Sequence, residues 1–267
     1  WIGIGNAIIG SLLAWVVLGR RTKVMTQHLN SKTMPDFFGE RYGSKALKIT
    51  ASAIVFIFLV PYTASVYNGL SRLFGMAFNI PYKYCVIGMA VFTGIYVILG
   101  GYMATAINDF IQGIIMLGGI VAVILAVLNG QGGFIQAVKT MAEIPSDVPV
   151  TMGQPGAFTS FFGPDPLNLL GVVILTSLGT WGLPQMVGKF YAIKDEKSIN
   201  TGTVISTLFA IVISGGCYFL GGFGRLFDAA ELHDEAGNMI FDGIIPHMLS
   251  TLPDILIGIV VVLVLSA

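Results

Sequence analysis

Long apolar stretches separated by short polar loops constrain this chain more than any other feature of its sequence. A membrane-spanning helix needs about 20 mostly apolar residues. Stretches of roughly that kind cover residues 1–18, 49–78, 84–99, 106–128, 167–187, 201–223 and 253–267. Only 10% of the residues are charged, whereas a soluble domain carries about 25%. The sequence therefore predicts an all-α polytopic membrane protein in a lipid bilayer, with residues 1–267 as a single transmembrane domain of about seven spans.

The basic residues indicate how the spans are oriented. Segments 19–48 and 188–200 fall on one side of the predicted membrane and contain ten Lys and Arg residues. The opposite loops contain three, Lys83, Lys139 and Arg225, together with most of the acids. Cytoplasmic loops carry the excess of Lys and Arg. We therefore expect a multi-pass protein of the plasma (inner) membrane with loops 19–48 and 188–200 in the cytoplasm. A short amphipathic helix around residues 134–141 should lie on the outer surface.

Apart from Asp254 at the very start of the last one, Asp109 is the only carboxylate within the seven predicted spans. An ionisable group inside a membrane costs a few kcal/mol, so it usually faces a cavity or a partner. A carboxylate there attracts a cation, and hard cations such as sodium prefer oxygen ligands. The alternative is an interfacial Asp that caps the start of its helix. The two roles are compatible, and the sequence leaves both open.

The fifth span, residues 167–187, is interrupted. The stretch from Ser177 to Gly188 contains Gly179, Gly182 and Pro184 as well as its closing glycine. Such interruptions often mark the unwound helix at a transporter's binding site. A simple proline kink, or close helix packing through small residues, is the alternative.

Other residues point to no further chemistry. Polar groups from Pro61 to Asn68 lie near the middle of the second span, where hydroxyls commonly bond back to their own helix. Phosphate-binding, zinc-protease, serine-hydrolase and dinucleotide motifs are absent from the sequence. The two cysteines and three histidines show no disulfide or metal spacing. Since these motifs and spacings are absent, we do not expect an enzyme, and the formal net charge of zero argues against a nucleic-acid-binding protein.

Three motifs of the sequence recur in a known family. The first motif is Thr33-Met34-Pro35-Asp36-Phe37-Phe38-Gly39-Glu40-Arg41-Tyr42. The second is Gly100-Gly101-Tyr102-Met103-Ala104 followed by Asp109 and Gln112, and the third is Gly182-Leu183-Pro184-Gln185 continuing to Lys189-Phe190-Tyr191-Ala192. Through these motifs the chain resembles the sodium:solute symporter family, which includes proline, pantothenate and sialic acid carriers and sodium–glucose transporters. Tyr102 and Asn108 depart from the residues most common in the family at those positions.

The resemblance implies a partial leucine-transporter-type fold, an inverted-repeat helix bundle. The chain begins and ends inside apolar runs and lacks an initiator Met, so we expect a fragment of a longer protein. On the family's register it holds core helices two to seven and the start of the eighth. The first core helix and the C-terminal remainder would then be supplied by the same protein outside this sequence.

The resemblance also implies site residues. Asp109 matches an acid linked to sodium binding or release, and Ala267 matches a main-chain carbonyl ligand of the principal sodium site. The remaining ligands of that site fall outside the chain. Positions that face the solute cavity or its gates match six residues, namely Tyr62, Thr176, Ser177, Thr180, Trp181 and Gln185. Gly3 is a weaker match for a cavity-lining position.

The function implied by the resemblance is sodium-coupled symport of a small organic solute by alternating access. Sodium moving down its gradient would drive the solute inward. The alternative, from a different class, is the membrane sensor domain of a symporter-like signalling protein. A third expectation is that these residues alone do not transport, because the principal sodium site cannot form without the first core helix.

Overall fold

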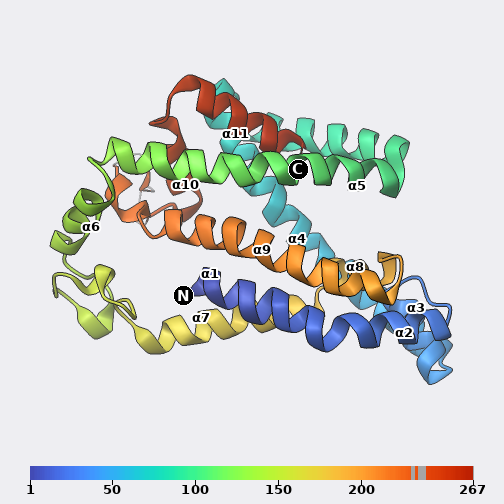
Figure 1. The fold of residues 1–267 in the computed structure, drawn as a ribbon. Helices are drawn as coiled ribbons and strands as arrows, with labels where there is room; N and C mark the ends of the chain where they lie inside the picture. The colour runs from blue at the N-terminus through green and yellow to red at the C-terminus, as the bar shows by residue number, and fades with distance from the viewer. Residues whose placement is uncertain (230–231, 234–238, 267) are drawn as a thin grey trace. The chain divides into compact units, whose positions relative to one another are not determined.

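The chain folds into helices and loops, as the sequence predicts. The computed structural model describes residues 1–229, 232–233 and 239–266, and no β-strand occurs within those ranges. Its long helices include α4 (Lys45–Phe78), α5 (Tyr82–Gly130) and α9 (Glu196–Gly221), which are labelled in Figure 1. The predicted all-α class is confirmed.

Several of the helices are long and apolar enough to cross a membrane. Within the residues that the structure describes, five segments qualify on length and hydropathy, namely Ile2–His28, Lys45–Phe78, Tyr82–Gly101, Met103–Gly130 and Glu196–Gly221. A sixth is formed if the bent pair Pro166–Gly182 and Pro184–Ala192 counts as one span. Large apolar side chains point outward from these helices, such as Phe56 at 73% exposure and Ile98 at 82%. Apolar surface on this scale is unfavourable in water and matches lipid chains, which confirms a polytopic membrane protein.

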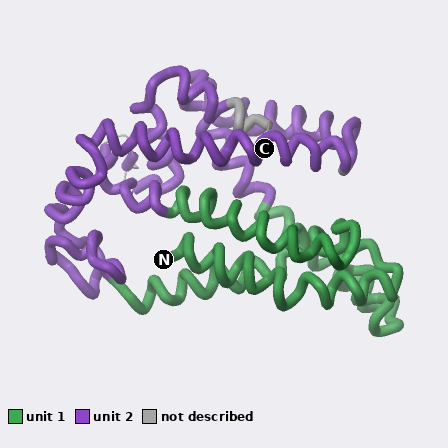
Figure 2. Tube along the Cα trace, in the orientation of Figure 1, with its two compact units in different colours: residues 1–62, 165–218 green, residues 63–164, 219–267 purple. Residues whose placement is uncertain are grey.

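The chain divides into two compact units, which Figure 2 colours green and purple. Unit 1 comprises residues 1–62 and 165–218, and unit 2 comprises residues 63–164 and 219–267. Both units are assembled from segments far apart in the sequence. The middle of α4 and the end of α9 are the points at which a helix passes from one unit to the other.

Unit 1 is built on a continuous helix from Ile2 to His28, referred to below as the N-terminal helix. It consists of α1 (Ile2–Gly5), π-helical stretches at Asn6–Leu13 and Trp15–Gly19, and α2 (Arg20–His28). Figure 1 shows it running beside α7 (Pro166–Gly179), and the two are in contact. π-Helical turns are rare and frequently occur at functional sites.

Glycines allow the helices of unit 1 to approach closely. A Cβ atom added to Gly3 would lie only 2.7 Å from the Cα atom of Gly215 on α9. A Cβ atom at Gly5 would lie 2.5 Å from Cγ1 of Val173 on α7. Small residues at such crossings are typical of helix packing in membranes, where van der Waals contact replaces the hydrophobic effect. These contacts fix the N-terminal helix against both α7 and α9.

The family motif at residues 33–42 forms a short capped helix, α3 (Met34–Tyr42). The Thr33 side chain accepts a hydrogen bond from the main-chain N–H of Asp36 at 3.2 Å, and Gly43 ends the helix with a φ of 59°. These are standard N-terminal and C-terminal caps. Asp36 also pairs with Lys48 at 2.6 Å. The hydrogen bond from Lys48, followed by that from Thr33, lowers the pKa of the Asp36 carboxyl below its ordinary value.

Unit 2 contains the rest of α4, α5, α6 (Phe134–Glu143), α10 (Phe241–Ser250) and α11 (Asp254–Ser266). In Figure 1, α11 packs along α5. α5 is broken at Gly101, whose φ of 60° and ψ of −170° suit glycine alone. The core of the unit includes the buried side chains Phe74, Met89, Val127 and Met248.

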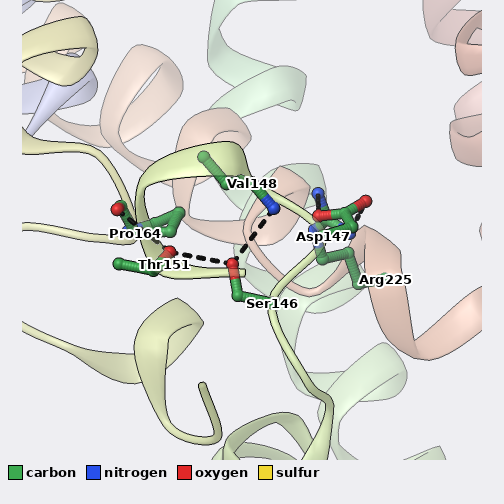
Figure 3. A network of polar contacts seen from close by, with 6 residues as sticks. All are labelled: Ser146, Asp147, Val148, Thr151, Pro164 and Arg225. Carbon is green, nitrogen blue, oxygen red and sulfur yellow. Dashed lines mark hydrogen bonds and ion pairs between the residues drawn. The ribbon is translucent and has the colours of Figure 1, made fainter. Parts of the chain in front are cut away.

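An arginine anchors the loop between α6 and α7 within unit 2. Arg225 donates to Asp147 at 3.0 Å from Nη1 to Oδ2, and its Nη2 lies 3.0 Å from Oδ1 (Figure 3). The same guanidinium lies 4.0 Å from the ring centre of Phe158. The hydrogen bond from Arg225 lowers the pKa of the Asp147 carboxyl below its ordinary value.

A second set of hydrogen bonds shapes the same loop. The hydroxyls of Ser146 and Thr151 lie 2.9 Å apart, and Thr151 donates to the carbonyl of Pro164 at 3.2 Å (Figure 3). The main-chain N–H of Val148 donates to Ser146 Oγ at 3.2 Å. The loop is therefore tied to itself by hydroxyls and to residues 224–227 by Arg225.

Candidate functional site

The helix that follows Asp165 is broken in the region where the sequence predicts an interruption. α7 ends at Gly179, a tight 3₁₀ turn covers Thr180–Gly182, and α8 (Pro184–Ala192) leaves at an angle of 47°. Leu183 at the joint is extended, with φ −69° and ψ 128°. A residue that precedes proline avoids the helical conformation, and proline is favoured in the first turn of a new helix. Pro184 thus both ends one helix and starts the next.

The break is held against the N-terminal helix by two polar contacts. The indole Nε1 of Trp181 donates to the main-chain carbonyl of Ile9 at 2.8 Å, within the first π-helical stretch. The hydroxyl of Ser177 lies 3.4 Å from the side-chain oxygen of Asn6, and Ser177 is fully buried. Gly10 lies opposite the break, because a Cβ atom there would be 3.3 Å from both Ser177 O and Thr180 Oγ1. Ser177 and Trp181 therefore position the N-terminal helix.

A cavity of about 680 Å³ lies beside the break within unit 1. We refer to it as the hydroxyl cavity, because most of its polar lining consists of hydroxyl groups. Its polar lining residues come from the N-terminal helix, α7, the break, α8 and α9, and are Asn6, Ser11, Thr176, Thr180, Lys189, Ser206, Ser214 and Tyr218. The volume falls in the range of about 300–1,000 Å³ that is typical of small-molecule sites.

Two hydroxyls of the cavity, those of Thr176 and Thr180, are arranged to accept hydrogen bonds. Thr176 donates its hydroxyl proton to the Val172 carbonyl at 2.8 Å, and Thr180 donates to the Ser177 carbonyl at 2.8 Å. With each proton engaged, the oxygen keeps lone pairs that can accept from a bound molecule. The hydroxyls of Ser11 and Ser206 lie 3.1 Å apart, which links the N-terminal helix to α9 across the cavity lining.

The six predicted solute-site residues separate into three groups. Thr176 and Thr180 line the hydroxyl cavity, whereas Ser177 and Trp181 contact the N-terminal helix. Tyr62 lies on α4 and lines a different, apolar groove of about 450 Å³ that also touches Gly182–Pro184. Gln185 is exposed in the first turn of α8 and lines neither cavity.

Asp109 lies on α5 in unit 2 and is exposed. The helical segment that contains it begins at Met103, so Asp109 is beyond the first turn. Since N-cap and dipole effects act within the first turn, capping does not explain this carboxylate. No group of three or more His, Cys, Asp or Glu gathers into a metal site in the part of the chain that the structure describes. A cation at Asp109 would therefore need further ligands of another kind, such as carbonyl, hydroxyl or water oxygens. Ala267, the second predicted ligand, lies outside the described residues.

On the N-terminal helix the sequence offered only Gly3, which packs against Gly215 and is not among the residues that line the hydroxyl cavity. Sequence reasoning missed Asn6, Gly10 and Ser11 on that helix and the whole contribution of α9. On α9 the lining residues Ser206, Ala210, Ser214 and Tyr218 recur every four residues. Residues four apart share one face of a helix. This spacing is visible in the sequence and is the signal that could have identified the lining of α9.

Comparison with known proteins agrees with the motifs. The chain matches the sodium:solute symporter family over residues 1–267. It is similar to the sodium/pantothenate symporter of Haemophilus influenzae, with 28% identity over 257 residues that cover 96% of this chain and 50% of the relative. The corresponding symporter of Escherichia coli (strain K12) is 27% identical over 214 residues, covering 78% of this chain and 42% of the relative.

A proline carrier is also similar. The sodium/proline symporter of Staphylococcus aureus is 33% identical over 206 residues, which cover 74% of this chain and 37% of the relative. The chain thus spans about half the length, or less, of the curated relatives it matches. Because the family match extends over every residue, the chain belongs to the sodium:solute symporter family.

Proposed function

We propose that this chain takes part in sodium-coupled symport of a small organic solute by alternating access. The observation that carries the proposal is the broken helix α7–α8 beside a cavity lined with hydroxyls. In transporters, discontinuous helices expose main-chain groups and half-helix ends to the solute and the coupling ion. Irregular backbone at membrane depth is tolerated where it lines a cavity or is buried in protein. Family membership supports the same reading.

The solute, in this proposal, occupies the hydroxyl cavity. Thr176 and Thr180 accept hydrogen bonds from it, while Ser177 and Trp181 hold the N-terminal helix in place. Tyr62 and Gln185 flank the break and act at the gates. The names of the relatives make pantothenate and proline the first solutes to test. A transporter of this kind performs no chemical conversion and is not an enzyme.

Sodium is the proposed coupling ion and is carried as cargo. Asp109 attracts the cation, and the main-chain carbonyl of Ala267 is one further ligand. The resemblance implies that the remaining ligands come from a first core helix and from a C-terminal remainder of a longer protein. The complete helix bundle would then have the leucine-transporter-type architecture. It would reside in the inner membrane with loops 19–48 and 188–200 in the cytoplasm.

Uptake by the native-length protein in proteoliposomes tests this proposal. An inward sodium gradient should drive accumulation of pantothenate or proline, and a potassium gradient should not. If the folded protein showed no sodium-dependent uptake of these or of sugars and sialic acid, symport would lose its support and a sensor role would gain it.

Replacement of Asp109 tests its role separately. Asp109→Asn should reduce the stimulation of solute uptake by sodium at least tenfold. This factor corresponds to about 1.4 kcal/mol of cation binding. Glu143→Gln is the matched control, because it removes one exposed carboxylate from α6, outside the predicted spans. Unchanged sodium dependence in Asp109→Asn would show that this carboxylate does not handle the cation, even if transport itself is confirmed.

A further inference from the structure

A basic groove lies where α2 meets α3 in unit 1. Its volume is about 860 Å³. Its charged or titratable lining consists of three arginines and one histidine, Arg20, Arg21, Arg41 and His28, and none of its described lining residues is acidic. We propose that this groove binds the phosphate headgroup of an anionic phospholipid from the adjacent leaflet. The proposal rests on the membrane placement of the N-terminal helix and needs neither sodium coupling nor transport.

The charge pattern of the N-terminal helix places the groove at headgroup depth. Residues 2–18 carry no charge, and Arg20 and Arg21 are the first charged side chains. Arg and Lys residues at the end of an apolar span place their charges at the membrane surface, because a charge in the hydrocarbon is costly. We therefore expect α2 (Arg20–His28) to extend into the layer that contains lipid phosphates.

Two of the arginines have charge available for a ligand. The Nε of Arg20 lies 3.1 Å from Glu196 Oε2, so its charge is partly compensated. Arg21 forms no ion pair among the described residues, and Arg41 lies 6.0 Å from the ring centre of Tyr42 without an acidic partner in that part of the chain. A guanidinium matches phosphate oxygens through paired N–H donors. The groove therefore presents a net positive field with the correct donors.

Apolar side chains in the groove favour a lipid over free phosphate. Val24 and Met25 from α2 and Phe37 from α3 line it together with the basic residues. Inorganic phosphate would use only the charged groups. A phospholipid would also cover these apolar side chains with its glycerol backbone and the first part of its acyl chains, and burial of apolar surface is favourable.

Binding of short-chain lipids to the full chain in neutral detergent tests the proposal. The probes are dioctanoyl phosphatidylglycerol, dioctanoyl phosphatidylcholine and inorganic phosphate. Phosphatidylglycerol should bind at least tenfold more tightly than either of the others, and its affinity should fall as salt is raised. Equal binding of phosphatidylcholine would overturn the proposal. Inorganic phosphate binding as tightly as phosphatidylglycerol would assign the groove to free phosphate.

A pair of double variants separates the groove from general surface charge. Arg21→Gln with Arg41→Gln removes two lining charges, while Lys194→Gln with Lys197→Gln removes two exposed charges that do not line the groove. Each basic residue near an anionic surface contributes about 1 kcal/mol, so the groove variant should bind phosphatidylglycerol about 30-fold more weakly. The control should change by less than about threefold. Equal losses in both variants would overturn the proposal.

Folding is checked by circular dichroism of each variant. If the groove variant does not fold, Arg21→Lys retains the charge but loses the paired donors, and it should weaken phosphatidylglycerol binding by a factor between that of the control and about 30-fold. The binding measurements with the three probes on the unaltered chain do not depend on the folding of any variant. Absence of any preference for phosphatidylglycerol in that series would by itself refute the site.

Discussion

Two tryptophans in unit 1 permit a matched test of how the break is held. Trp181 Nε1 donates to the Ile9 carbonyl at 2.8 Å. Trp15 Nε1 is buried and has no hydrogen-bond partner among the described residues, although its ring packs edge-on against Phe190 with a centroid separation of 5.0 Å. Replacing each with Phe removes the same N–H group and the same volume. The two substitutions therefore differ mainly in whether a hydrogen bond is lost.

The expected difference follows from the cost of each polar group. Loss of the Trp181 hydrogen bond should destabilise the fold by about 1 kcal/mol. Removal of the unsatisfied donor of Trp15 should recover about 1–3 kcal/mol, which offsets the packing lost with the larger ring. Trp181→Phe should therefore lower the free energy of unfolding by about 2–4 kcal/mol more than Trp15→Phe.

The measurement is the free energy of unfolding in mixed micelles of neutral detergent and sodium dodecyl sulfate, followed by far-ultraviolet circular dichroism. Both variants and the unaltered chain are titrated under identical conditions. If Trp15→Phe were as destabilising as Trp181→Phe, or more so, the hydrogen bond to Ile9 would not be what holds the N-terminal helix against the break.

Two further predictions concern helix packing and loop anchoring. Gly3→Ala should destabilise the fold by about 1–3 kcal/mol, because the new Cβ atom would lie 2.7 Å from a main-chain carbon of α9. Gly171→Ala is the control, because nothing lies within 4 Å of the added Cβ atom, and it should be neutral or stabilising by up to about 1 kcal/mol. The same detergent titration measures both variants. A larger loss of stability in Gly171→Ala than in Gly3→Ala would contradict the packing account. Because Arg225 lowers the pKa of Asp147, their ion pair should stabilise the 144–164 loop above about pH 4 and be lost as pH falls through that lowered pKa. A spin label on the loop should become mobile over that acidic range, and Asp147→Asn should be mobile throughout, with no step.

Hydropathy predicts where helices meet lipid better than where they end. The first apolar stretch ends at Leu18, but the helix continues to His28. Charged side chains such as Arg20 leave the hydrocarbon without disturbing main-chain hydrogen bonds, so composition marks the edge of the lipid and not the end of the helix. The break in α5 is different, because the Gly100-Gly101 pair is a local signal and Gly101 adopts a conformation that only glycine readily takes.

In the candidate site, too, features set by the local sequence were predictable and features set by packing between distant segments were not. Pro184 and its neighbouring glycines act on their own backbone, so the interruption of the helix was predictable from the sequence. Ser206 and Ser214 were not, because a serine in an apolar helix commonly bonds back to its own turn. Their four-residue spacing puts them on one face, but only packing against the N-terminal helix determines that this face lines the cavity.

Protection of a cysteine in the hydroxyl cavity tests the central claim most directly. The native-length protein would carry Thr180→Cys in a background with Cys85 and Cys217 replaced by Ser, and its rate of modification by a water-soluble thiol reagent would be measured. Thr140→Cys on the exposed face of α6 is the control. A transported solute with sodium should slow modification at position 180 at least fivefold and leave position 140 unchanged. Equal rates at position 180 with and without solute, in a protein that transports it, would contradict the assignment of the solute to this cavity.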